Sequence, residues 1–160
     1  MSKTLFARGA RFAAVVAVCL VAAACSQTRP ELTSGNSSVA AGSGQDFVVN
    51  VGDRVFFLNN QSSLDGAARG VLDKQAQWLQ HYKNYSITIE GHADERGTRQ
   101  YNIALGARRA AAVREYLVAK GISPSRIKTI SYGKERPVAV CNAASCWSQN
   151  RRAVTVLNGQ

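Results

Sequence analysis

One arginine interrupts an otherwise largely apolar helix face in the second half of the chain. Residues at helical spacing share this face, and they are Asn102, Leu105, Arg109, Ala112, Val113 and Tyr116. A guanidinium on a buried or half-buried face is costly unless it meets a carboxylate. The pattern leaves two alternatives open, because that carboxylate can belong to the protein itself or to a bound ligand.

A polar loop, Gly91-His-Ala-Asp-Glu-Arg-Gly-Thr98, precedes this helix and leaves the end of a predicted strand. The amino end of a helix offers main-chain N–H groups and a positive dipole to an anion. In the same loop, Asp94 or Glu95 offers a carboxylate to an ammonium group. A carboxylate and the Arg109 guanidinium within a few ångströms of each other suit a zwitterion, such as the head group of an amino acid.

Alternating strand and helix patterns must position these residues. The helix over 64–79 has apolar residues at i, i+3, i+4 and i+7, and Ser62 with Asp65 forms a capping-box pattern at its start. The helix over 98–120 is ended by Gly121 and by Pro124. Strands are predicted at 54–58, 85–91, 127–131 and 153–157. The order β-α-β-α-β-β predicts an α/β fold, a two-layer sandwich with helices packed on a mixed sheet.

Several linked motifs resemble those of the OmpA-like peptidoglycan-binding domain family, and in particular its lipid-anchored members. The similarity covers about residues 50–157. The motifs are Glu90-Gly-His-Ala-Asp94-Glu-Arg-Gly-Thr98, Tyr101-Asn102, Leu105, Arg109-Ala110, Val113, Ser131-Tyr-Gly-Lys-Glu135 and Asn150-Arg-Arg152.

The resemblance implies a ligand and a set of binding residues. The positions of Asp94 and Arg109 imply a clamp on the side-chain amine and carboxylate of meso-diaminopimelate in the peptidoglycan stem peptide. Asn102 is then expected to help position the loop, and the further expected contacts are Gly97, Thr98, Tyr101, Leu105 and Arg152. Asn60 stands where relatives often have an aspartate near the rim of the groove.

The resemblance also implies partners beyond the cell wall. It implies work with the Tol system in envelope integrity and cell division, through contact with the periplasmic beta-propeller protein of that system (TolB). Wall binding and propeller binding are expected to compete for overlapping surface. An alternative is an interaction lipoprotein whose main ligand is the propeller protein, and in either case we expect the domain to be monomeric.

The amino end has the features of a lipoprotein signal peptide over 1–24. Lys3, Arg8 and Arg11 are followed by an apolar run of 13 residues that ends at Ala24. As a helix this run would rise about 20 Å, short of the roughly 30 Å hydrocarbon core, so we expect no permanent membrane span. Val21-Ala-Ala-Ala24 directly before Cys25 resembles a lipobox, which implies acylation of Cys25. Ser26, rather than an aspartate, resembles the pattern for delivery to the outer membrane.

The remaining chain divides into a lipidated, flexible tether over 25–46 and a domain over 47–160. The tether is rich in Ser, Gly, Thr, Asn and Ala and lacks the apolar residues needed for a core. The full chain of 160 residues has a formal net charge of +10, and without the three basic residues of the signal the charge is +7. A basic protein of this kind fits a polyanion or a carboxylate-rich polymer such as the cell-wall peptides. We place the domain in the periplasm.

The cysteines after Cys25 are Cys141 and Cys146. Export to an oxidising compartment favours a disulfide between them, provided that the geometry allows it. The alternative is a pair of reduced, buried thiols.

Other function classes have weaker support. Asp94, Glu95 and His92 lie together, but no activated nucleophile or second carboxylate at a recognisable separation accompanies them, so we expect no enzyme. His92 and His81 are a weak metal pair, and a strand-end His92 hydrogen-bonded to its loop is the expected alternative. We therefore expect no metal and no cofactor. Nucleic-acid binding is suggested by several arginines, but the export signal argues against it.

Overall fold

The computed structural model describes residues 39–159 of the chain. The strands are β1 (Arg54–Phe56), β2 (Ser86–His92), β3 (Ile127–Gly133) and β4 (Arg152–Asn158). The main helices are α3 (Gly66–His81) and α4 (Arg99–Ala119), and the shorter ones are α2 (Gly44–Asp46), η1 (Phe47–Val51), η2 (Pro124–Arg126) and α5 (Ala144–Asn150). The predicted β-α-β-α-β-β order is confirmed. The structure adds α2 and η1 before β1, and η2 and α5 within the second half.

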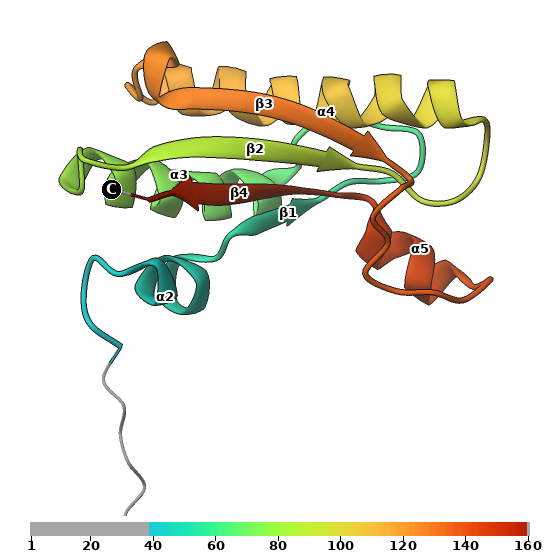
Figure 1. Cartoon of the computed structure of the whole chain (residues 1–160), viewed down its shortest axis with the longest axis horizontal. Helices are drawn as coiled ribbons and strands as arrows, with labels where there is room; N and C mark the ends of the chain where they lie inside the picture. Colours follow the sequence, from blue (N-terminus) through green and yellow to red (C-terminus); the bar gives the residue numbers. More distant parts are fainter. Residues whose placement is uncertain (1–38, 160) are drawn as a thin grey trace, which may run out of the picture. The chain divides into compact units, whose positions relative to one another are not determined.

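The four strands form one mixed sheet in the order β1-β4-β2-β3 (Figure 1). Strand β4 pairs antiparallel with β1 and β2, whereas β2 pairs parallel with β3. Helix α4 provides the crossover between the two parallel strands. The carboxyl ends of β2 and β3 therefore lie at the same edge of the sheet, where the loop that leads into α4 begins.

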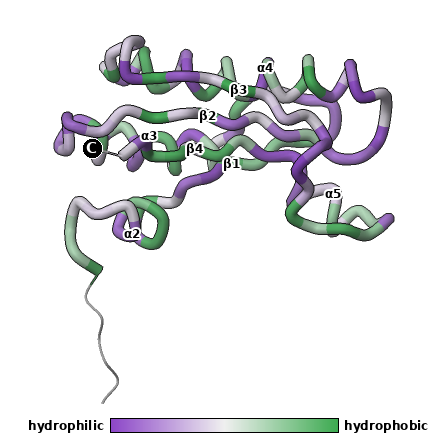
Figure 2. The backbone as a smooth tube through the Cα atoms, in the orientation of Figure 1, coloured by the Kyte–Doolittle hydropathy of each residue, from purple (hydrophilic) through white to green (hydrophobic). Residues whose placement is uncertain are grey.

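Helices α3 and α4 cover one face of the sheet, as predicted for a two-layer sandwich (Figure 1). The core between the layers combines Leu72 and Leu79 of α3, Val113 of α4, and Ile87 and Ile89 of β2. Figure 2 shows hydrophobic and hydrophilic residues alternating along α4, and its buried face combines Leu105, Val113 and Leu117 with the polar Asn102 and Arg109. Among residues 39–159, no helix is both long and apolar enough to span a membrane.

Two glycines let α4 approach the sheet closely. A Cβ atom added to Gly91 of β2 would lie 1.9 Å from the carbonyl oxygen of Gly106 in α4. A Cβ atom added to Gly106 would lie 2.4 Å from Ser131 Oγ. The first half of α4 thus rests against the end of β2, directly beside the loop that carries Asp94.

The first turn of α3 differs from the predicted capping box. Asp65, not Ser62, is the residue before the helix, and its side chain accepts a hydrogen bond of 2.8 Å from the Ala68 amide. The prediction of Ser62 as the cap is wrong. Asp65, which lies three residues after Ser62, accepts from a free N–H group of the first turn instead.

Packing on the domain begins at about Gly42, inside the predicted tether. The Asp46 carboxylate accepts hydrogen bonds from the Gly42 amide and from Trp78 Nε1, both between 2.8 and 2.9 Å. Tyr85 Oη donates to the Gly42 carbonyl at 2.9 Å, and Phe47 is 1% exposed in the core. These contacts attach the segment before β1 to the end of α3. The predicted signal peptide, Cys25 and most of the tether lie outside the described residues.

Candidate ligand-binding site

A pocket of about 280 Å³ lies between the loop after β1, the loop from β2 to α4, and the first turns of α4. Its lining combines three side-chain amides, an acid, two arginines and an aromatic ring on a partly apolar wall. The lining residues are Asn59, Asn60, Asp94, Arg96, Gly97, Tyr101, Asn102, Leu105 and Arg109.

The loop into α4 is held by local hydrogen bonds. Gly97 has φ of 88°, in the left-handed region that favours glycine, and Thr98 caps α4 by accepting from the Tyr101 amide at 3.2 Å. The buried Asn102 side chain donates to the Arg96 carbonyl at 2.8 Å. Asn102 therefore fixes the main chain of the loop from within α4.

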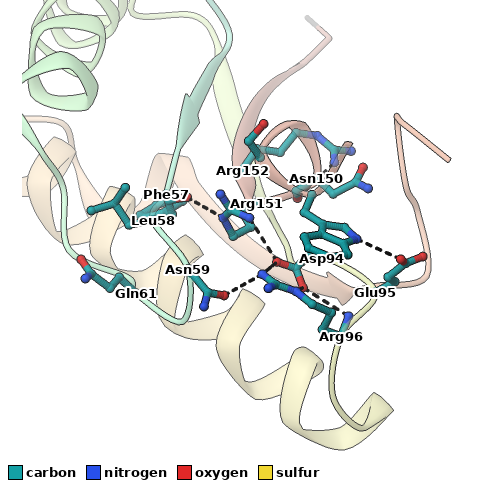
Figure 3. A network of polar contacts seen from close by, with 12 residues as sticks. Phe57, Leu58, Asn59, Gln61, Asp94, Glu95, Arg96, Asn150, Arg151 and Arg152 are labelled. Carbon is teal, nitrogen blue, oxygen red and sulfur yellow. Dashed lines mark hydrogen bonds and ion pairs between the residues drawn. The ribbon is translucent and has the colours of Figure 1, made fainter. Parts of the chain in front are cut away.

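The Asp94 carboxylate is surrounded by arginine donors (Figure 3). Arg96 contacts it with Nη2 at 2.7 Å and with Nε at 3.2 Å, and Arg151 Nη1 lies 3.3 Å away. Burial acts to raise the pKa of Asp94, but hydrogen bonds from the Arg96 side chain and amide and from Arg151 outweigh burial and hold the pKa below its usual value. Asp94 is therefore ionised at neutral pH.

Arg109 has no exposed surface, and it meets main-chain oxygens instead of a carboxylate. Its Nε donates to the Gln61 carbonyl at 2.9 Å, Nη1 to His92 at 2.7 Å and Nη2 to Leu58 at 3.2 Å. Burial, followed by the positive charge of Arg151, lowers the pKa of Arg109 to about 10, so the side chain stays charged at neutral pH. Of the two alternatives for Arg109, an ion pair with a protein carboxylate is not found within residues 39–159.

Six of the eight predicted ligand contacts line this one pocket, and they are Asp94, Gly97, Tyr101, Asn102, Leu105 and Arg109. Thr98 caps the helix beside it. Arg152 does not line the pocket, because its buried guanidinium turns to the carbonyls of Arg136 and Asn150. Its neighbour Arg151 does not line the pocket either, but it is the arginine of this pair that reaches Asp94. Asn60 lines the pocket and is hydrogen-bonded through its side chain to Tyr101 Oη.

Sequence reasoning missed two groups that act on Asp94 or its loop. Arg96 pairs with the carboxylate and also donates to Asn59 Oδ1 at 2.7 Å (Figure 3). Trp147 of α5 donates through Nε1 to Glu95 at 2.9 Å, and its ring lies 4.3 Å from the Arg96 guanidinium. Arg96 belongs to the recognised loop motif, so its positive charge two residues after Asp94 could have predicted that the two side chains pair. Trp147 is 52 residues from Glu95 and left no such signal.

Cys141 and Cys146 form a disulfide, with Cα atoms 5.8 Å apart. The bond closes the segment that begins α5. Asn150 at the end of α5 holds the chain just before Cys141, because its side chain accepts from the Val138 amide at 2.9 Å and donates to the Ala139 carbonyl at 2.8 Å. The alternative of two reduced thiols is therefore not what the structure contains, and the disulfide supports the helix that carries Trp147.

His92 differs from the predicted loop-bonded histidine. Its ring is 2% exposed, and neither ring nitrogen has a hydrogen-bond partner among the described residues. Glu90 Oε2 lies 3.7 Å from Nε2. Burial, with the charges of Arg152 and Arg136, lowers the pKa of His92 to about 4. The functional contact of His92 is its carbonyl, which holds Arg109.

The comparison with known proteins places this geometry in a family. The OmpA family model matches residues 56–152, which include the whole pocket. Peptidoglycan-associated lipoproteins from Mesorhizobium japonicum and Rhizobium meliloti are 58% and 66% identical, over 91% and 78% of this chain and 90% and 71% of theirs. The chain belongs to the OmpA family, among the peptidoglycan-associated lipoproteins.

Solved structures agree with this membership of the OmpA family. The peptidoglycan-associated lipoprotein from Burkholderia pseudomallei is 39% identical and has a TM-score of 0.65, covering 66% of this chain and 90% of that one. The carboxyl-terminal domain of MotB from Helicobacter pylori has a TM-score of 0.63 over 68% of this chain and 85% of that one. Its 22% identity supports the OmpA-like fold alone.

Proposed function

We propose that the pocket binds peptidoglycan without covalent attachment, through the meso-diaminopimelate residue of the stem peptide. The observation that carries this proposal is an ionised carboxylate and a charged guanidinium in the lining of one pocket, Asp94 and Arg109. In this binding mode the ligand amine approaches Asp94 and the ligand carboxylate approaches Arg109. The names of the relatives support the cell wall as the polymer.

Arg109 has donors to spare for a ligand. A guanidinium has five N–H donors, and the three main-chain carbonyls use three of them. The remaining donors belong to Nη1 and Nη2, whose fork matches a carboxylate. Because Arg109 is fully covered and Asp94 is 6% exposed, ligand binding requires a shift of the side chains that line the pocket.

The proposed role is binding and not catalysis. The main chain around the pocket is held by Thr98 and Asn102, which suits recognition of a fixed ligand shape. Around Asp94 the polar groups are arginines that stabilise its ionised form. A general acid or base instead needs a pKa near the working pH.

We further propose that acylation of Cys25 anchors the protein in the outer membrane with the domain in the periplasm, so that it links that membrane to the wall. The lipobox-like sequence and the lipoprotein relatives support this anchor. Labelled palmitate should be incorporated into the wild-type protein and not into Cys25→Ser. Equal labelling of the two would contradict the anchor. Contact with the Tol propeller protein remains part of the proposal by family resemblance.

The ligand site is tested by adding the tripeptide L-Ala-γ-D-Glu-meso-diaminopimelate to full-length protein in detergent solution. We expect concentration-dependent NMR shifts of the main-chain amides of Gly97, Tyr101 and Leu105. Shifts restricted to residues outside the pocket, or none at all, would contradict the proposed site.

A further inference from the structure

Arg96 stabilises the ionised form of Asp94. We propose that it also determines ligand specificity, because it competes with the ligand amine for the Asp94 carboxylate. A ligand must then displace Arg96 and give it a new carboxylate partner. The inference rests on the proposed function, because it assumes that Asp94 receives an ammonium group. It predicts that the pocket rejects a ligand that has the ammonium group but lacks the neighbouring carboxylate.

All the acceptor positions of Asp94 are in use. A carboxylate accepts about four hydrogen bonds. Oδ1 accepts from the Arg96 amide and from Arg96 Nε, each at 3.2 Å. Oδ2 accepts from Arg96 Nη2 at 2.7 Å and from Arg151 Nη1 at 3.3 Å. An incoming ammonium therefore has to replace one of the two guanidinium groups.

Arg96 is the group that can leave. Its side chain is 40% exposed and lines the pocket. The Arg151 side chain is 14% exposed and is anchored by its Nε to the Phe57 carbonyl at 3.0 Å. Asn102 holds the Arg96 main chain and not its side chain, so the guanidinium can swing away while the loop stays in place.

The displaced guanidinium has contacts that do not depend on Asp94. The Trp147 ring lies 4.3 Å from it, and Asn59 Oδ1 accepts from Nη2 at 2.7 Å (Figure 3 shows Asn59 and Arg96). Neither contact supplies a negative charge. Among residues 39–159, Glu95 is the one carboxylate besides Asp94 whose charge acts to raise the pKa of Arg96, and three guanidinium groups, those of Arg96, Arg109 and Arg151, lie around the pocket and Asp94. One remaining carboxylate does not balance these three cations once Asp94 is taken by an ammonium, so a further carboxylate from the ligand would stabilise them. A zwitterionic ligand meets this need, because its ammonium takes Asp94 while its carboxylate joins the arginines.

Two tripeptides that differ in one carboxylate separate this role from a merely structural one. L-Ala-γ-D-Glu-L-Lys has the side-chain ammonium of the meso-diaminopimelate peptide but lacks its side-chain carboxylate. Isothermal titration of both peptides into full-length protein in detergent gives four affinities for wild type and Arg96→Gln. Arg99→Gln is the matched control, since Arg99 is 74% exposed, pairs with Glu135 and does not line the pocket.

In wild type we expect the diaminopimelate peptide to bind more tightly than the lysine peptide. In Arg96→Gln the lysine peptide should bind about tenfold more tightly than to wild type, the effect of removing one competing bidentate ion pair. The preference for diaminopimelate should fall by at least as much. Arg96→Lys, which keeps the charge but loses the bidentate fork, should lie between the two. Arg99→Gln should bind both peptides as wild type does.

Several outcomes would overturn the competitor role. Unchanged or weaker binding of the lysine peptide by a folded Arg96→Gln protein would show that Arg96 does not compete for Asp94. Equal losses for both peptides would assign Arg96 a structural role. Failure of wild type to bind the diaminopimelate peptide would contradict the proposed function itself, which is a different result from either of these.

Discussion

The Arg109 guanidinium donates a hydrogen bond of 2.7 Å to the His92 carbonyl, which ties the middle of α4 to the end of β2. Two further bonds reach the loop after β1, at Leu58 and Gln61. One buried cation thus organises both loops that form the pocket. Arg109 is therefore a structural residue as well as a proposed ligand contact, and substitutions at this position affect folding and binding together.

Arg109→Lys tests this double role. A lysine keeps the charge but cannot reach three carbonyls in different directions with one ammonium group. We expect the free energy of unfolding to fall by about 3 kcal/mol, measured by urea denaturation, because buried acceptors lose their donors. An Arg109→Lys protein that unfolds at the same urea concentration as wild type would contradict the structural part of the role of Arg109.

His92 predicts a dependence of stability on pH. Its pKa is lowered to about 4 in the fold against an ordinary value of 6.5, so the unfolded chain binds a proton between these pH values and the folded chain does not. Stability should therefore fall as the pH falls from about 6.5 to about 4. Thermal melting in this range should be less pH-dependent for His92→Gln than for wild type. Equal slopes for the two proteins would contradict the prediction.

The disulfide should stabilise α5 and, through it, the pocket. Closing so short a segment is worth about 2 kcal/mol in the chain-entropy account. For the double variant Cys141→Ser, Cys146→Ser we expect a stability loss of this size by urea denaturation. Relative to wild type, hydrogen exchange of the Trp147 amide should accelerate more than that of amides elsewhere in the domain. Exchange at Trp147 that matches wild type would contradict the link to α5.

The close contact between Gly91 and Gly106 should tolerate no side chain. In Gly91→Ala the new Cβ atom would meet main-chain atoms of α4, so we expect a loss of about 3 kcal/mol or more in urea denaturation. Gly70→Ala is the matched control, because Gly70 is exposed within α3 and a Cβ atom there meets nothing within 4 Å. The control should gain about 0.5–1 kcal/mol. Equal effects of the two substitutions would contradict the contact.

The main elements of the fold could be predicted because their periodicity is visible in the sequence. The apolar stripes of α3 and α4 and the alternation of Ile87 and Ile89 on β2 needed no tertiary information. Helix α5 has seven residues and no apolar period, so the prediction missed it. Phe47 was assigned to the start of the domain, but its place in the core depends on Trp78, 31 residues away.

The site could be predicted in its composition but not in its pairing. Asp94 and Arg109 lie in recognisable local patterns, whereas the partners that reach them come from distant segments, as Arg151 does across 57 residues. Arg151 and Arg152 are neighbours, and only the register of β4 determines which of them faces Asp94 and which turns to Arg136. Register is a property of the whole sheet, so no local motif could have chosen between them.

The most direct test of the central claim is sedimentation of the protein with isolated peptidoglycan. Asp94→Asn removes the charge of the carboxylate, and Asp73→Asn is the matched control because Asp73 pairs with Lys120 at 2.8 Å and does not line the pocket. We expect wild type and Asp73→Asn to pellet alike, and Asp94→Asn to bind at least about tenfold more weakly. A folded Asp94→Asn protein, verified by circular dichroism, that pellets as wild type does would contradict the claim that this pocket holds the cell wall.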